Sequence, residues 1–117
     1  MEKKPSDLPI MDKNIDKAFT KNSSKILKEL LDLFIKETPM LQAEINSAFR
    51  NQQQQKLEDR LHKLLGSCVY CGWLRLKVSI IALEKAIAQQ IYSNELLEQF
   101  NLELEAALVK AKEITRS

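Results

Sequence analysis

The residues best suited to chemistry lie in one short stretch, from His62 to Trp73. It contains the only histidine of the 117-residue chain, both glycines (Gly66 and Gly72), both cysteines and the only tryptophan. Gly66 follows His62 by four residues, so the two are neighbours on one face if the stretch is helical. A glycine inside a helix costs roughly 1 kcal/mol relative to alanine. We therefore interpret Gly66 as leaving room beside an imidazole for something that must approach it.

The composition indicates one all-helical domain. Apolar residues make up 44% of the chain and charged residues 29%, which is ordinary for a globular protein. Two glycines and three prolines leave little turn chemistry. The net charge of +2 is too small to favour nucleic acid by itself. No apolar run approaches the roughly 20 residues that span a bilayer, and no secretory signal is recognisable, so we expect a cytoplasmic protein.

Apolar periodicity predicts an antiparallel, up-down-up-down four-helix bundle over residues 10–117, with a short extra N-terminal helix. Residues 1–9 are polar and contain two prolines, so we expect a disordered lead or linker. Asp12 is expected to cap the short helix, which carries Ile15 and Phe19. No internal repeat is visible.

The four long helices are predicted from caps, breakers and spacing. Residues 22–24 supply a helix start, and Pro39 should kink or break the helix that follows. Gly72 is expected to end the helix that runs over about residues 54–70, as a C-terminal glycine does, and Ser93 or Asn94 is expected to cap the last helix. The predicted helices span about 24–51, 54–70, 73–91 and from 94 onwards.

A helical projection of the segment around His62 predicts that its side chain faces solvent. At 100° per residue, the apolar side chains cluster about 130° away from it. That cluster consists of Leu57, Leu61, Leu64, Cys68 and Cys71. Around His62 itself fall Gly66, Asp59, Tyr70, Lys63, Glu58 and Val69, and Leu65 lies between the two faces.

An exposed histidine restricts the possible chemistry. Triad catalysis needs an orienting carboxylate and a nucleophile in a cleft, which the convex side of a bundle does not provide. Zinc needs three or four converging ligands, whereas His62, Cys68 and Cys71 point to different faces of one helix. Redox Cys-x-x-Cys motifs begin helices, but these cysteines end one, so we interpret them as small core residues. Nucleophilic attack on an activated phosphoryl group remains, with Lys63 offsetting the charge.

The stretch resembles a known family. It reads His62-Lys-Leu-Leu-Gly66-Ser-Cys-Val-Tyr-Cys-Gly72-Trp-Leu-Arg-Leu76, followed by Leu83-Glu84. This motif is similar to that of the histidine phosphotransfer (Hpt) domain, and particularly to that of the C-terminal Hpt domain of BarA/GacS-type tripartite hybrid sensor kinases. The segment Leu33-Phe-Ile-Lys-Glu-Thr-Pro39 resembles the family's first bundle helix. The likeness covers about residues 10–112.

The resemblance implies a phosphorelay intermediate in two-component signal transduction. His62 would be the phosphoacceptor, taking a phosphoryl group from a receiver-domain aspartyl phosphate and passing it to the aspartate of a response regulator, or the reverse. Gly66 would leave space for the receiver, and Lys63 would help to hold the phosphoryl oxygens. Hpt domains bind no nucleotide and have no kinase activity of their own. No cofactor is expected, because Mg²⁺ and the catalytic acids belong to the receiver.

One departure from the family pattern concerns phosphate binding. Many members carry a lysine immediately before the glycine, where this chain has Leu65. Phosphate stabilisation would then depend on Lys63 alone. We expect Leu65 and Val69 instead to form an apolar rim that docks the receiver, with Ile35 or Met40 from the preceding helix. Tyr70 and Trp73 are expected to pack at the helix end.

The partners expected from the resemblance are receiver domains of a hybrid sensor kinase and of a response regulator. No nucleic acid, metal site or direct membrane contact is expected, and the isolated domain is expected to be monomeric and part of a larger sensor kinase. Two alternatives stay open. One is a non-phosphorylated helical adaptor that binds a receiver or kinase, and the other is a metal- or redox-active bundle built on Cys68 and Cys71.

Overall fold

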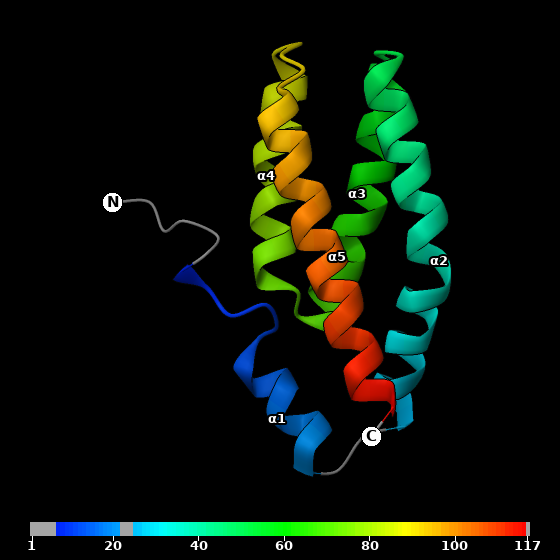
Figure 1. The fold of residues 1–117 in the computed structure, drawn as a ribbon, viewed down its shortest axis with the longest axis vertical. Helices are drawn as coiled ribbons and strands as arrows, with labels where there is room; N and C mark the ends of the chain where they lie inside the picture. The colour runs from blue at the N-terminus through cyan, green and yellow to red at the C-terminus, as the bar shows by residue number, and fades with distance from the viewer. Residues whose placement is uncertain (1–6, 22–24, 117) are drawn as a thin grey trace.

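The computed structural model describes residues 7–21 and 25–116, and over these ranges it is an all-helical bundle. The four long helices run up and down, each against the next in the chain, and the last packs against the first (Figure 1). The four-helix bundle with a short N-terminal helix is therefore confirmed. No helix in the described ranges is long and apolar enough to cross a membrane. The helices are α1 (Lys13–Lys21), α2 (Lys25–Arg50), α3 (Gln54–Cys71), α4 (Leu74–Ala88) and α5 (Asn94–Arg116).

The observed helices agree with the predicted boundaries to within about three residues. Asp12 caps α1, because its Oδ1 accepts the backbone N–H of Asn14 at 2.8 Å. The Ser93 hydroxyl accepts the N–H of Leu96 at 3.3 Å at the start of α5. Helix α2 continues through Pro39 without a break. The predicted start at 22–24, residues 1–6 of the predicted lead and the side chain of Phe19 lie outside the described residues.

The core is one cluster of apolar side chains to which all four long helices contribute. Trp73, at the α3–α4 turn, and Phe100, on α5, are its largest fully buried members. Each fully buried leucine or isoleucine contributes about 1.5–3 kcal/mol through the removal of apolar surface from water. Helix α3 supplies Leu57, Leu61, Leu64, Cys68 and Cys71, the five residues that the projection placed on its inner face.

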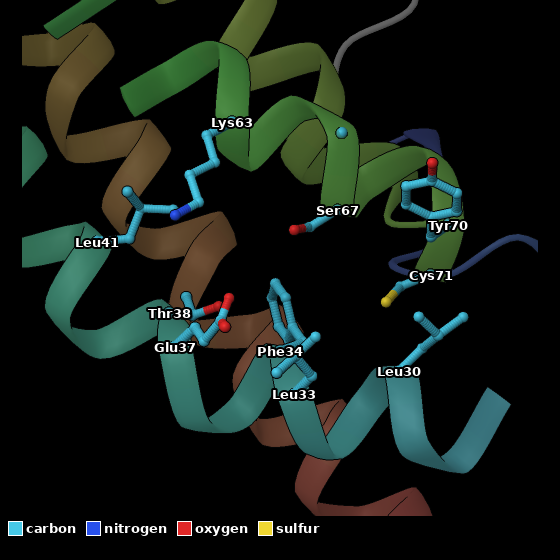
Figure 2. A pocket seen from close by; sticks show the side chains of 11 residues that line it. Leu30, Leu33, Phe34, Glu37, Thr38, Leu41, Lys63, Ser67, Tyr70 and Cys71 are labelled. Carbon is cyan, nitrogen blue, oxygen red and sulfur yellow. The ribbon is translucent and has the colours of Figure 1, made fainter. Parts of the chain in front are cut away.

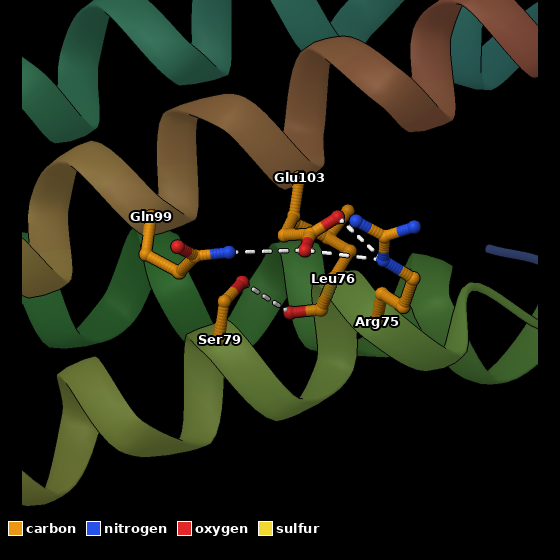
Figure 3. A network of polar contacts seen from close by, with 5 residues as sticks. All are labelled: Arg75, Leu76, Ser79, Gln99 and Glu103. Carbon is orange, nitrogen blue, oxygen red and sulfur yellow. Dashed lines mark hydrogen bonds and ion pairs between the residues drawn. The ribbon is translucent and has the colours of Figure 1, made fainter. Parts of the chain in front are cut away.

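One carboxylate is buried between α4 and α5. Glu103 is 2% exposed, and it pairs with Arg75 Nε at 3.0 Å and accepts the Gln99 side-chain N–H at 3.0 Å (Figure 3). Ser79 on α4 donates to the carbonyl oxygen of Leu76 at 2.8 Å. A buried carboxylate that loses its partner costs several kcal/mol, so this network disfavours any sliding of α4 against α5.

Three helix ends are closed by a residue in the left-handed region. The φ angles are 73° at Gly72, 51° at Gln52 and 61° at Gln90. Such residues let the amides beyond the helix bond back to its last carbonyls, as the N–H of Ile91 does to Ala86 O at 2.8 Å. Glycine adopts this conformation freely, whereas other L-residues lose about 1–2 kcal/mol in it. Two of the three bundle turns therefore carry glutamine where glycine is better suited.

We expect Gln90→Gly to raise the free energy of unfolding by up to about 1 kcal/mol, because it relieves the left-handed backbone strain. Urea unfolding followed by circular dichroism measures the change. Gln89→Gly is the matched control, since Gln89 has φ −94° and gains nothing from glycine. Equal effects at positions 89 and 90 would contradict this reading of the turn.

Candidate functional site

Helix α3 presents His62 near its middle, on the exposed face that the projection predicts. Its neighbours Leu61 and Leu64 are fully buried, so the imidazole is turned to the outside of the bundle. Lys63 is exposed as well, and Gly66 is half-buried one turn further on. Two hollows flank this face of α3. His62 lines the one toward α4, and Lys63 and Gly66 line the one toward α2.

The hollow toward α4 is acidic. Glu58 and Asp59 enter it from α3 and Glu84 from α4, all around His62. Burial raises the pKa of Glu84 above its ordinary range, the charge of His62 opposes this rise, and the charge of Glu58 adds to it. The Glu84 carboxylate is thus close enough to interact with a charged imidazole. The sequence motif contained Glu84 but no signal for this role, because only the packing of α4 on α3 brings it to His62.

The hollow toward α2 is a groove of about 260 Å³ with a largely apolar wall (Figure 2). The Ser67 hydroxyl points into the groove, and the Lys63 side chain extends across it toward Leu41 and Thr38 of α2. The apolar side chains that line it include Leu30, Leu33, Phe34 and Leu41.

The two glycines of the motif differ in whether the fold requires glycine at their positions. A Cβ added to Gly66 would have no heavy atom within 4 Å beyond its own helix and chain neighbours. The fold therefore has no steric need for a glycine there. A Cβ on Gly72 would lie 2.5 Å from Ile15 Cδ1 and 3.0 Å from Asp12 Cβ, at φ +73°. Gly72 is a structural requirement, whereas Gly66 leaves open surface beside His62.

The residues expected to form a docking rim differ in exposure. Val69 is 63% and Met40 73% exposed, whereas Leu65 and Ile35 are half-buried against the core. Trp73 is fully buried, as expected. The expectation that Tyr70 packs at the helix end is wrong, since it is 67% exposed and lines the groove. Tyr70 lies two turns beyond Lys63 on the flank of α3 that faces α2, away from the buried face.

Both cysteines are free and buried. Burial raises the pKa of Cys68 to about 12, and the neighbouring Cys71 adds to the rise. Burial likewise raises the pKa of Cys71 to about 11. Both thiols are protonated at neutral pH and are therefore poor nucleophiles and ligands. Among the described residues, no group of three His, Cys, Asp or Glu side chains is placed to hold a metal.

We expect Gly66→Ala to stabilise the protein by about 0.5–1 kcal/mol, because alanine favours the helix and meets open space. Urea unfolding measures this change. Gly72→Ala is the contrasting variant and should destabilise the protein through its φ of +73° and the contact with Ile15. A loss of stability at position 66 comparable to that at 72 would show that the fold requires Gly66.

Glu84→Gln should stabilise the protein at pH 7.5, and the gain should shrink toward zero near pH 4. The pKa of Glu84 is raised in the folded protein, so its ionised form is disfavoured there relative to the unfolded chain. That cost is complete above the raised pKa and vanishes once the carboxyl is protonated in both states. Urea unfolding at the two pH values tests this, with Asp59→Asn on the same hollow as control. An equal gain at both pH values would contradict it.

The Hpt domain family matches the chain over residues 29–110, from the second turn of α2 to the last third of α5. A search of curated proteins and a search of solved structures found no match. The matched range is most of the chain and holds His62, both hollows and the helices that form them. Hpt domains interact with receiver domains. The chain thus belongs to the Hpt domain family, the histidine phosphotransfer intermediates of phosphorelay signalling.

Proposed function

We propose that His62 is the phosphoacceptor of this domain and exchanges phosphoryl groups with the aspartates of two receiver domains. The observation that carries this is the pairing of His62 with Gly66. The only histidine of the chain is exposed at mid-helix, beside a glycine for which the fold has no steric need. A partner that must bring a phosphorus atom to the imidazole needs unobstructed protein surface beside it.

The transfer is a displacement at phosphorus. A nitrogen lone pair of His62 attacks the phosphorus of an aspartyl phosphate, the N–P bond forms as the P–O bond breaks, and the aspartate leaves as a carboxylate. The imidazole gains positive charge as the N–P bond forms. The carboxylates of Glu84 and Glu58, which line the same hollow, favour that charge. The receiver is expected to bring the Mg²⁺ that neutralises the phosphoryl oxygens.

Lys63 is the proposed partner of the phosphoryl oxygens once they are on His62. Its side chain extends toward α2 across the groove, so it must swing to the imidazole side to make this contact (Figure 2). An exposed lysine has the rotamer freedom to do so. Leu65 occupies the position before Gly66 and offers no charge, which leaves Lys63 as the nearest cation along α3.

We propose that the receiver approaches His62 over Gly66 from the α2 side. Met40 and Tyr70 line the hollows on that side and expose large apolar or aromatic surface. Val69, which is exposed, and Leu65, which is half-buried, add apolar surface on α3 close to His62. The α4 side carries the acidic hollow instead. The catalytic acids of a receiver would be repelled by three carboxylates, so the charge distribution favours the α2 approach.

The type of sensor kinase to which this domain belongs is proposed from the residues of the motif. The sequence from His62 to Gly72 supports the proposal that this is the C-terminal Hpt domain of a BarA/GacS-type hybrid sensor kinase. On that proposal residues 10–117 form the domain and residues 1–9 a linker. The partners would be the receiver of that kinase and of its response regulator. A monomeric domain in the cytoplasm is part of the same proposal.

We expect the wild type to gain acid-labile, base-stable phosphate from a phosphorylated receiver domain, and His62→Gln to gain none. The measurement is transfer of labelled phosphate, followed by acid and base treatment of each protein. Circular dichroism of the variant serves as the folding control. Label on neither protein, with the receiver still bound, would contradict the proposal and favour a non-phosphorylated adaptor.

A further inference from the structure

The segment that leads into α1, together with the first residues of that helix, is bound to the turn between α3 and α4. Residues 10–15, called the strap here, form an antiparallel β-bridge in which Met11 faces Trp73. The N–H of Asp12 donates to Gly72 O at 2.7 Å, and the N–H of Leu74 donates to Ile10 O at 3.0 Å. Met11 is 3% exposed and belongs to the core cluster. The strap thus completes the burial of the turn that ends the His62 helix.

Gly72 is the seat of the strap. Its missing Cβ would collide with Ile15 and would press on Asp12, so the strap occupies the space that the absent side chain leaves. The seat combines two backbone hydrogen bonds with a close fit of Ile15 and Asp12 against a residue whose φ of +73° favours glycine. A segment that merely trailed over the surface would need neither.

The strap is connected to the α2–α3 groove by a short path of buried rings. Trp73, the residue bridged to Met11, is fully buried and packs against Phe34 of α2, with the ring centroids 5.2 Å apart and the ring planes tilted by 37°. Phe34 and Cys71 both line the groove, and Cys71 directly precedes Gly72. The groove wall beside Gly66 therefore rests on the tryptophan that the strap holds in place.

The contacts that hold the strap are local. They comprise its two backbone hydrogen bonds to the α3–α4 turn, the buried side chain of Met11, and Ile10 and Ile15 packed against the core. Local opening of a short segment costs less free energy than unfolding of the whole domain. Loss of these contacts can therefore unseat the strap while the bundle helices stay folded.

We propose that the strap is a conformational device that controls the receiver-docking groove. Seated, it holds Trp73 against Phe34 and keeps the groove in its docking shape. Unseated, it releases Trp73, and the groove loses affinity for a receiver while His62 stays intact. The coupling rests on the proposed function in one respect, namely that a receiver docks on the α2 side.

The test opens the strap in the full chain with Met11→Asp, which places a carboxylate in a buried apolar position. Ile15→Ala is a milder second variant, and Lys13→Asp, at an exposed neighbouring position, is the control. Emission and acrylamide quenching of Trp73, the only tryptophan, report unseating. Hydrogen exchange at the Leu74 amide reports loss of its bond to Ile10. The dissociation constant for a receiver domain reports the groove.

We expect Met11→Asp to expose Trp73, to deprotect the Leu74 amide, to retain helical circular dichroism and to weaken receiver binding at least about fivefold, the low end of allosteric coupling. Ile15→Ala should change all three readouts in the same direction by less, and Lys13→Asp none. Unchanged receiver affinity with an exposed Trp73 would overturn the coupling. The coupling would also be overturned if the Leu74 amide stayed protected in both Met11→Asp and Ile15→Ala. It would likewise be overturned if both variants lost helical circular dichroism together with protection of the Leu74 amide.

A separate arm distinguishes failure of the coupling from failure of the proposed function. Phosphoramidate, a small phosphoryl donor, needs no docking groove, so it should label His62 equally in the wild type and the strap variants. Absence of label from all of them would count against His62 as phosphoacceptor. The receiver dissociation constants would still decide whether the strap controls the groove.

Discussion

The burial of one apolar face of α3 is the constraint on which the site depends. Leu57, Leu61 and Leu64 are fully buried, and each contributes about 1.5–3 kcal/mol, which together is comparable to the total stability of a small domain. A rotation of α3 by one residue position would bring either Lys56, Arg60 and Lys63 or Glu58, His62 and Leu65 into these places, and either set would put charged or polar side chains in the core. The helix therefore has one orientation in the bundle, and that orientation presents His62 to solvent.

The two flanks of His62 differ in chemistry, and this difference favours one side for the approach of a partner. Carboxylates from α3 and α4 gather on one flank, where they favour positive charge on the imidazole. Apolar and aromatic side chains gather on the other, along the groove between α2 and α3. Gly66 lies open beside the histidine. The buried contact of Glu103 with Arg75 supports the first flank, because it holds the position of α4, which carries Glu84.

The bundle and the orientation of His62 were predictable because both follow from periodicity within single helices. Leu61 and Leu64 repeat at helical spacing, and one projection of α3 places His62 opposite to them. The acidic hollow was not predictable in this way, because Glu84 reaches it only through the packing of α4 on α3. Tyr70 was expected to pack at the helix end, although the projection already placed it on the exposed side with His62, and the structure puts it at the rim of the groove.

The strap had no signal in the sequence either. Residues 10–15 show too short a pattern to predict a partner, and Gly72 reads equally as an ordinary helix stop. Only the structure shows that the helix stop is also the seat of Asp12 and Ile15. Gly72 thus has two structural roles, because it ends α3 and accommodates the strap, whereas Gly66 leaves open surface beside His62.

On the proposed function, the open surface at Gly66 serves a receiver domain that must reach His62. The most direct measurement compares the rates at which a receiver domain and phosphoramidate phosphorylate Gly66→Ala and the wild type. We expect the receiver reaction to slow markedly and the reaction with the small donor to stay unchanged, because only the receiver has to cover position 66. Equal rates for the variant and the wild type with both donors would contradict it.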